Sequence, residues 1–209
     1  FLRPGDQVVH STPLYGGTET LLRKILPEWS IGGHPLISGL SAAEMETALE
    51  TAAARGRVGL FYVETPANPT NSLIDLQAVV ASIDRFEQKH GYRPISACDN
   101  TMLGPIFQHP IREGIDQSIY SLTKYVGGHS DLVAGGVTGR RDLIARLRLL
   151  RSAFGSQLDP HSSWMIARSM ETLVLRMRRA AATGSRVAHC LAGNSIRSVQ
   201  VLHPQLITD

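Results

Sequence analysis

The stretch "RVGLFYVE" (residues 57–64) is an almost unbroken apolar run, long enough for one strand. Such a run predicts a strand that is buried on both faces, as in a parallel sheet with helices on either side. Both flanks are expected to be helical. Ser41 and Glu44 have the spacing of a capping box that opens a helix over 42–56. An amphipathic pattern over 72–91 follows and ends at a glycine. The order helix, buried strand, helix indicates an α/β protein.

The same alternation extends along the chain. Further strands are expected from Val8–Val9 and over 94–100, 115–123, 131–139 and 196–202. Helical spacing covers 16–26, 141–155 and 162–193, the last as one long helix or as two with a break near Gly184. Strands that alternate with helices predict a mostly parallel sheet covered on both faces.

Composition excludes several classes of protein. The chain has 209 residues and a formal net charge of only +3, and its arginines are scattered, so a nucleic-acid surface is not indicated. The sequence contains no run of 18 apolar residues, which a membrane span would need, and it contains no signal-peptide pattern. Two cysteines, Cys98 and Cys190, form neither a CxxC motif nor a disulfide framework. A reducing cytoplasm is the expected compartment.

Polar residues follow three of the expected strands. Asn68 comes after the run at 57–64, Asp99 closes the next strand, and Ser121, Thr123 and Lys124 close the one after it. Because ligands gather at the carboxyl ends of parallel strands, these side chains are expected to meet at one edge of the sheet. They outline a cofactor site.

Their chemistry narrows the cofactor. A lysine beside apolar neighbours loses hydration, so its neutral amine can form a Schiff base, and Lys124 is one of only three lysines. A buried Asp99 needs a cationic partner such as a protonated pyridine nitrogen. Ser121 and Thr123 alternate with Leu122, so on a strand both hydroxyls would point to one face and suit phosphate oxygens. Together these groups describe pyridoxal 5'-phosphate.

The motifs also carry a family resemblance, over essentially all 209 residues and in the same order. The chain resembles the pyridoxal-phosphate enzymes of cysteine and methionine metabolism, which include cystathionine γ-synthases and γ-lyases, homoserine sulfhydrylases and methionine γ-lyases. The motifs are "PLYGGT" (13–18), "VETPANPT" (63–70), "CDNTMLGPIFQHP" (98–110), "YSLTKYVGGHSD" (120–131), "LRMRR" (175–179) and "VQVLHPQL" (199–206). The resemblance implies a type I aminotransferase-like fold and γ-elimination or γ-replacement on sulfur amino acids or homoserine esters.

The resemblance also implies a role for individual residues. Lys124 would be the Schiff-base lysine and would move protons, and Asp99 would partner the pyridine nitrogen. Tyr15 would stack on the pyridine ring and help in proton transfer. This role is implied by the resemblance alone, because Tyr15 does not follow any of the three strands named above. Without the family, a lone tyrosine is more often a packing residue.

The remaining roles concern cofactor binding. Ser121 and Thr123 would hold the phosphate, and Asn68 would lie near the phenolic oxygen of the ring. Asn68 precedes Pro69, so its alternative interpretation is a turn cap. Gly17 occupies a position where methionine γ-lyases usually have cysteine, which favours cystathionine or an O-acylhomoserine over methionine as substrate.

Organisation beyond the site is likewise implied by the family. Residues 1–175 would form the cofactor domain and 176–209 the start of a smaller C-terminal domain. A phosphate-binding segment would precede Phe1, and the arginine that grips the substrate carboxylate would follow Asp209. Family active sites are shared between subunits, so a homotetramer built from dimers is expected.

Two other functions fit the sequence less well. Tyr120 and Lys124 match the Tyr-x3-Lys pair of short-chain dehydrogenases, but that pair needs a helix, and "SIYSLT" favours a strand. A non-catalytic protein with the same fold is the third possibility, and the presence of Lys124, Asp99 and Tyr15 together argues against it. His129 and Asp131 have no third ligand at useful spacing, so they are interpreted as a hydrogen-bonded turn rather than a metal site.

Overall fold

A six-stranded sheet organises the computed structural model, which describes residues 1–37 and 41–193. Its order is β2-β1-β3-β4-β5-β6; all neighbours are parallel except β5 and β6, which are antiparallel. The strands are β1 (Gln7–Thr12), β2 (Gly32–Ile37), β3 (Val58–Glu64), β4 (Ile95–Asp99), β5 (Gln117–Ser121) and β6 (Gly135–Gly139). The expected mostly parallel α/β fold is confirmed, with β2 as a strand that the sequence analysis did not predict.

Helical segments connect these strands. The first connection is continuous from α1 (Gly16–Thr20) through a π-helical turn (Leu21–Ile25) to α2 (Leu26–Glu28). The others are α3 (Ala42–Ala53), α4 (Leu76–His90), α5 (Gly104–Phe107), α6 (Arg141–Phe154), α7 (Pro160–Met170) and α8 (Leu173–Gly193). Ser41 and Glu44 form the predicted capping box of α3. Helix α4 begins later than expected, because the Asp75 side chain caps it, and it ends at Gly91 with a left-handed φ of 74°.

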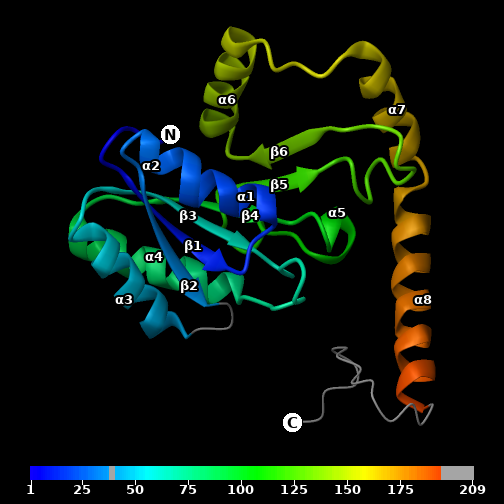
Figure 1. Ribbon diagram of the computed structural model, residues 1–209, viewed down its shortest axis with the longest axis horizontal. Coiled ribbons are helices and arrows are strands. Elements are labelled where there is room, and N and C mark those ends of the chain that lie inside the picture. The colour runs from blue at the N-terminus through cyan, green and yellow to red at the C-terminus, as the bar shows by residue number, and fades with distance from the viewer. Residues whose placement is uncertain (38–40, 194–209) are drawn as a thin grey trace.

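Helices cover the sheet on both faces, as Figure 1 shows. On one face α3 and α4 bury Met45, Leu49 and Ile83 against Phe61 of β3. On the other, the segment from α1 to α2 packs against Tyr62, the next residue of the same strand. Because successive side chains of a strand point to opposite faces, this alternation confirms that β3 is buried on both sides.

The C-terminal helices break at a different place from the one predicted. The pattern over 162–193 forms two helices, but they separate at Glu171–Thr172, and Gly184 lies inside α8. Arg176 donates hydrogen bonds to the Ser169 carbonyl oxygen (2.8 Å) and to the Thr172 hydroxyl (3.0 Å) across this break. These side-chain bonds engage the carbonyl and hydroxyl groups at the break, whereas the single glycine at 184 is tolerated within α8. The strand expected over 196–202 lies outside the described residues.

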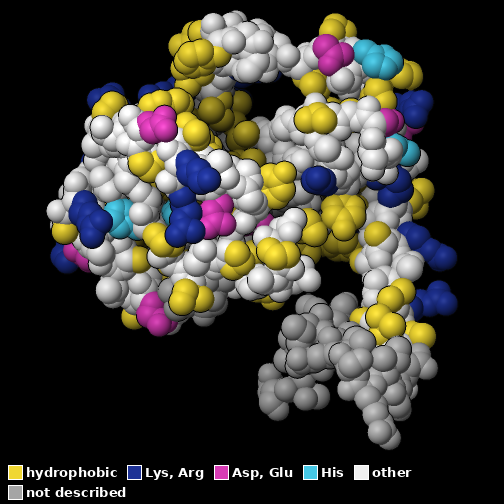
Figure 2. All heavy atoms as spheres, viewed as in Figure 1, with side chains coloured by type: hydrophobic (Ala, Val, Ile, Leu, Met, Phe, Trp, Pro, Cys, Tyr) yellow, Lys and Arg dark blue, Asp and Glu magenta, His cyan; other side chains and the backbone are white. Residues whose placement is uncertain are grey.

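Helix α8 extends away from the sheet as a separate column (Figure 1). It carries exposed apolar side chains, among them Leu175, which is 71% exposed. Figure 2 shows Lys and Arg side chains along the outer side of this column. Within residues 1–37 and 41–193, none of the helices combines the length and apolar character needed to cross a bilayer.

Candidate cofactor-binding site

A pocket of ≈ 340 Å³ opens at the carboxyl ends of β3, β4 and β5. Residues from five separate stretches of the chain line it. The six residues predicted from the sequence are all among them: Tyr15, Asn68, Asp99, Ser121, Thr123 and Lys124. The expectation that three strand ends converge at one edge of the sheet therefore holds in the structure.

Asp99 is the last residue of β4 and is half-buried at the base of this pocket. Its Oδ1 accepts the backbone N–H of Thr101 (3.0 Å), and its Oδ2 accepts the Tyr62 hydroxyl (3.3 Å). Burial, and next the Asp99 charge, raise the pKa of Tyr62, so this hydroxyl stays protonated as a donor. Cys98 points to the opposite face and is fully buried in the core, as its position on the strand predicted.

Lys124 lies in a tight turn that follows β5. Its backbone N–H donates to the Ser121 carbonyl oxygen (3.1 Å), and its own carbonyl oxygen accepts the N–H of Gly128 (2.7 Å). Gly128 has a φ of +78°, which a glycine adopts without strain. Arg176 of α8 donates to the carbonyl oxygens of Tyr125 (2.6 Å) and Val126 (3.1 Å), which fixes the turn from outside.

Two expectations about this turn are wrong. Strand β5 ends at Ser121, so Thr123 is not on the strand, and the alternation argument does not apply to it. The Thr123 hydroxyl instead accepts the N–H of Ala134 (2.9 Å), which joins the turn to the segment before β6. Lys124 is exposed rather than shielded by its apolar neighbours in sequence, because it lies in the turn beyond the end of β5.

Tyr15 and Asn68 stand on loops after β1 and β3. Both side chains are exposed, and Tyr15 has 53% of its surface open. Their backbone N–H groups donate to the two oxygens of a single carboxylate, that of Glu64, each at 2.8 Å. Asn68 is thus part of a turn, and its side chain also lines the pocket.

Sequence reasoning did not identify the other residues of the pocket. They are Glu64, Pro66, Thr101, Met102 and Val133. Glu64 had a usable signal, because it is a carboxylate at the end of an otherwise apolar strand that was already predicted to be buried. Thr101 had no such signal in the sequence. It belongs to the site because its hydroxyl accepts a hydrogen bond from the backbone N–H of Ser121 (2.8 Å).

The charges of the pocket suit a ligand with a cationic ring and an anionic group. Glu64 and Asp99 lie side by side on β3 and β4, and neither is in an ion pair with a Lys or Arg of the described chain. Lys124 is the single cation among the residues that line the pocket, all of which lie in the described part. A protonated pyridine nitrogen would compensate the carboxylates, the Ser121 hydroxyl would suit a phosphate oxygen, and the Lys124 amine would suit an aldehyde, whereas the Thr123 hydroxyl also donates to the Ala134 carbonyl oxygen (3.3 Å). The residues present therefore fit pyridoxal phosphate.

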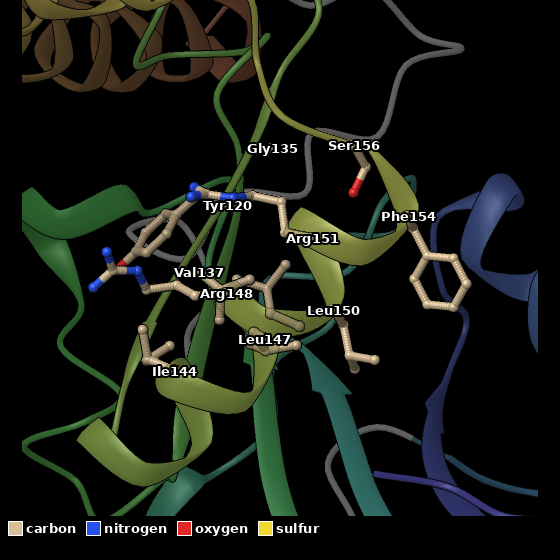
Figure 3. A pocket seen from close by; sticks show the side chains of 12 residues that line it. Tyr120, Gly135, Val137, Ile144, Leu147, Arg148, Leu150, Arg151, Phe154 and Ser156 are labelled. Carbon is tan, nitrogen blue, oxygen red and sulfur yellow. The ribbon is translucent and has the colours of Figure 1, made fainter.

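Tyr120 does not share this site. It lies on β5, and its hydroxyl accepts a hydrogen bond from the Asn100 amide (3.3 Å). It lines a different pocket of ≈ 630 Å³, between β5, β6 and α6, whose side chains Figure 3 shows. That pocket is mostly apolar, with Arg148 and Arg151 as its charged lining residues in the described chain. The Tyr-x3-Lys pair is therefore on a strand and a turn rather than on a helix, and the dehydrogenase interpretation is not favoured.

A parallel sheet with a lysine, a carboxylate and hydroxyls at its strand ends defines the class of pyridoxal-phosphate enzymes with a type I aminotransferase-like fold. A family model described as "Cys/Met metabolism PLP-dependent enzyme" matches residues 1–209. The chain belongs to this family.

Individual relatives agree with this assignment. The chain is 37% identical to a cystathionine gamma-synthase of Mycobacterium leprae, over 98% of this chain and 50% of the relative. It is also 37% identical to an L-methionine gamma-lyase of Pseudomonas deceptionensis, over 97% of this chain and 46% of the relative. A solved structure of cystathionine gamma-lyase from Lactobacillus plantarum superposes with a TM-score of 0.82 at 28% identity, over 93% of this chain and 48% of that one. The chain spans about half the length of the curated relatives it matches.

Proposed function

We propose that the protein is a pyridoxal-phosphate enzyme that carries out γ-elimination or γ-replacement on sulfur amino acids or homoserine esters. The observation that carries the proposal is the convergence of Tyr15, Asn68, Asp99, Ser121, Thr123 and Lys124 on one pocket. Pyridoxal phosphate, when bound, supplies an electron-withdrawing ring that stabilises negative charge on the substrate carbon.

The residues of the pocket divide this work. Lys124 would bind the cofactor covalently and, once the substrate amine replaces it, would take the α-proton on its Nζ atom. Asp99 would keep a proton on the pyridine nitrogen, because its carboxylate has no other cationic partner in the described chain. Tyr15 would cover the ring face and assist proton transfer at its hydroxyl.

Three residues would bind rather than transfer protons. Ser121 and Thr123 would donate hydrogen bonds to the phosphate, Thr123 by exchanging its present bond to the Ala134 carbonyl oxygen (3.3 Å), and Asn68 would lie near the phenolic oxygen. Support comes from their common position on the wall of the pocket. Lys124 would also lie beside these hydroxyls, since its N–H is bonded to the Ser121 carbonyl oxygen.

For the substrate, we propose cystathionine or an O-acylhomoserine in preference to methionine. Gly17 supports this choice, because a Cβ atom there would lie 2.9 Å from the Tyr15 ring, so the cysteine typical of methionine γ-lyases would displace that ring. A substrate panel on the purified full-length protein, with and without cysteine or sulfide, tests the preference. Methanethiol from methionine, with cystathionine and acylhomoserines inert, would overturn it.

The assembly belongs to the same proposal. Residues 1–175 would be the cofactor domain and 176–209 the start of the C-terminal domain, within a cytoplasmic homotetramer with shared active sites. Exposed apolar side chains on α7 and α8, including Trp164 and Leu175, support a contact between subunits there. Analytical ultracentrifugation of the full-length protein tests the tetramer.

Covalent labelling tests the central assignment. The full-length protein should be yellow with cofactor, and borohydride should bleach it and fix the cofactor to the polypeptide. Peptide mapping should place the label on Lys124 and not on Lys24 or Lys89, the other two lysines of this chain. Lys89 is a suitable internal control because its amine is exposed and in an ion pair with Glu50 (2.9 Å). Label on a lysine other than Lys124 would contradict the proposed role.

A further inference from the structure

One buried carboxylate of the pocket has no role in the mechanism above. Glu64 is the last residue of β3, it is 4% exposed, and its backbone N–H donates to the Ser11 hydroxyl of β1 (3.0 Å). Its neighbour in the sheet register is Asp99. Glu64 therefore lies between the end of β1, from which the Tyr15 loop departs, and Asp99 at the end of β4.

The carboxylate joins two loops that are far apart in the sequence. Its Oε2 accepts the N–H of Tyr15, 49 residues earlier, and its Oε1 accepts the N–H of Asn68 in the following turn, each at 2.8 Å. These loops carry the residue proposed to cover the ring and the residue proposed to lie near its phenolic oxygen. One side chain thus sets the distance between two walls of the pocket.

Keeping this group ionised costs free energy. Burial raises the pKa of Glu64, the Asp99 charge raises it further, and the two N–H donors oppose both effects. Among the described residues it has no Lys or Arg partner that would offset the burial. The two N–H donors favour the ionised form, because a carboxylate offers one acceptor oxygen to each of them.

The geometry shows why a neutral side chain fails. A glutamine has one acceptor oxygen, so its NH₂ group would face one of the two N–H donors and leave that donor without an acceptor. An aspartate is one methylene shorter and cannot keep both bonds at 2.8 Å without moving a loop. Both oxygens of an ionised glutamate are needed.

We propose that Glu64 is a positioning residue that sets the spacing of the Tyr15 and Asn68 loops for the cofactor. This inference rests on the proposed function for the identity of the ligand. Glu64 acts through the two loops, since both of its oxygens are engaged by backbone N–H groups.

The first test uses the full-length protein as Glu64→Gln, with Asp116→Asn as the matched control. Asp116 is also a buried carboxylate that accepts a backbone N–H, from Ser96 at 2.9 Å, but it lies at the opposite end of the sheet. Glu64→Gln should weaken pyridoxal phosphate binding by on the order of ten-fold and change the circular dichroism of the bound cofactor. Asp116→Asn should lower the melting temperature without either change. Equal cofactor affinity and circular dichroism in Glu64→Gln and the unsubstituted protein would overturn the inference.

A double-mutant cycle separates positioning from general destabilisation. If Glu64 acts through Tyr15, Glu64→Gln should weaken binding much less when Tyr15→Ala is already present. Independent, additive losses would contradict the part of the proposal in which Glu64 acts through the Tyr15 ring.

Amide hydrogen exchange supplies a readout that needs no cofactor. In the cofactor-free protein, Glu64→Gln should raise the exchange rate at Tyr15 or Asn68 by at least several-fold, and Asp116→Asn should leave both rates unchanged. Unchanged exchange at both amides in Glu64→Gln would overturn the positioning role. If the unsubstituted protein binds no pyridoxal phosphate, the proposed function fails, while the exchange result still decides whether Glu64 holds the loops.

Discussion

The two ends of the parallel sheet hold buried carboxylates in different ways. At the amino end, Asp6 precedes β1 and Asp116 precedes β5, and each is paired with an arginine: Arg57 Nε lies 3.0 Å from Asp6, and Arg140 Nη1 lies 2.9 Å from Asp116. At the carboxyl end, Glu64 and Asp99 receive only neutral N–H and O–H donors from the described residues. Arginines thus compensate the negative charge at the amino end, whereas Glu64 and Asp99 at the carboxyl end have no arginine partner among the described residues.

This difference separates a structural use of buried charge from a functional one. A buried carboxylate with its own arginine has no further need of a cation, so the amino end is complete within the chain. The carboxyl end is complete only when a cationic group enters the pocket. A ligand with a protonated pyridine ring is therefore expected at the carboxyl end.

Asp99→Asn should have the largest effect. The cofactor should still bind through Lys124 and the hydroxyls, but turnover should fall about 10²-fold or more, because an amide holds the proton on the ring nitrogen less strongly than a carboxylate. Steady-state rates, with cofactor content measured on the same samples, check the prediction. Near-normal turnover in Asp99→Asn would remove Asp99 from the mechanism and abolish the contrast between the two ends.

Asp116→Asn should change stability instead of activity. The substitution removes the charge that faces Arg140 but keeps one oxygen for the N–H of Ser96, so we expect a loss of about 1–2 kcal/mol in the free energy of unfolding. The estimate is modest because the Arg140 side chain is 54% exposed. Urea unfolding measures the loss, and turnover per folded molecule should stay unchanged.

Asp142→Asn is the control for this prediction. Asp142 pairs with the same Arg140, at 2.8 Å, but its own side chain is exposed. Little change in unfolding is expected, because water already solvates this carboxylate. If Asp116→Asn and Asp142→Asn lose the same free energy of unfolding, then the burial of Asp116 does not strengthen its contribution to stability.

The parts of the fold that local pattern determines were predictable. The apolar run of β3 and the capping box of α3 both formed as expected, and parallel topology then brought Asp99 and Lys124 to one edge. Strand β2 was missed because "GGHPLI" has two glycines and a proline, which weaken any strand signal. It forms beside β1, so its conformation depends on a neighbour rather than on its own residues.

Features set by individual hydrogen bonds were not predictable from spacing. The break between α7 and α8 involves the Arg176 side chain, and the place of Thr123 involves the N–H of Ala134. The burial of Glu64 could have been predicted from its place at the end of an apolar run, but its partners could not, because they are backbone N–H groups, which no residue type reveals. Local sequence therefore predicted which groups meet in the pocket, but not what holds them there.

The smallest expected effect concerns Gly17, in the loop wall of the carboxyl end. A Cβ atom at this position would lie 2.9 Å from Cε1 of Tyr15, whereas one at Gly16 has no neighbour within 4 Å. Both residues lie in α1, so alanine at either should favour the helix by up to about 1 kcal/mol. Gly17→Ala must in addition turn the exposed Tyr15 ring, which is cheaper than moving backbone.

Gly17→Ala should therefore weaken pyridoxal phosphate binding a few-fold without lowering the melting temperature, and Gly16→Ala should leave binding unchanged. Cofactor titration and thermal unfolding of both variants measure the two effects separately. If Gly17→Ala binds the cofactor more weakly but unfolds at a higher temperature, then the native Gly17 lowers helix stability and keeps the Tyr15 ring in place. Equal binding by Gly16→Ala and Gly17→Ala would mean that the Tyr15 ring does not need its present position, and that Glu64 alone sets this wall of the pocket.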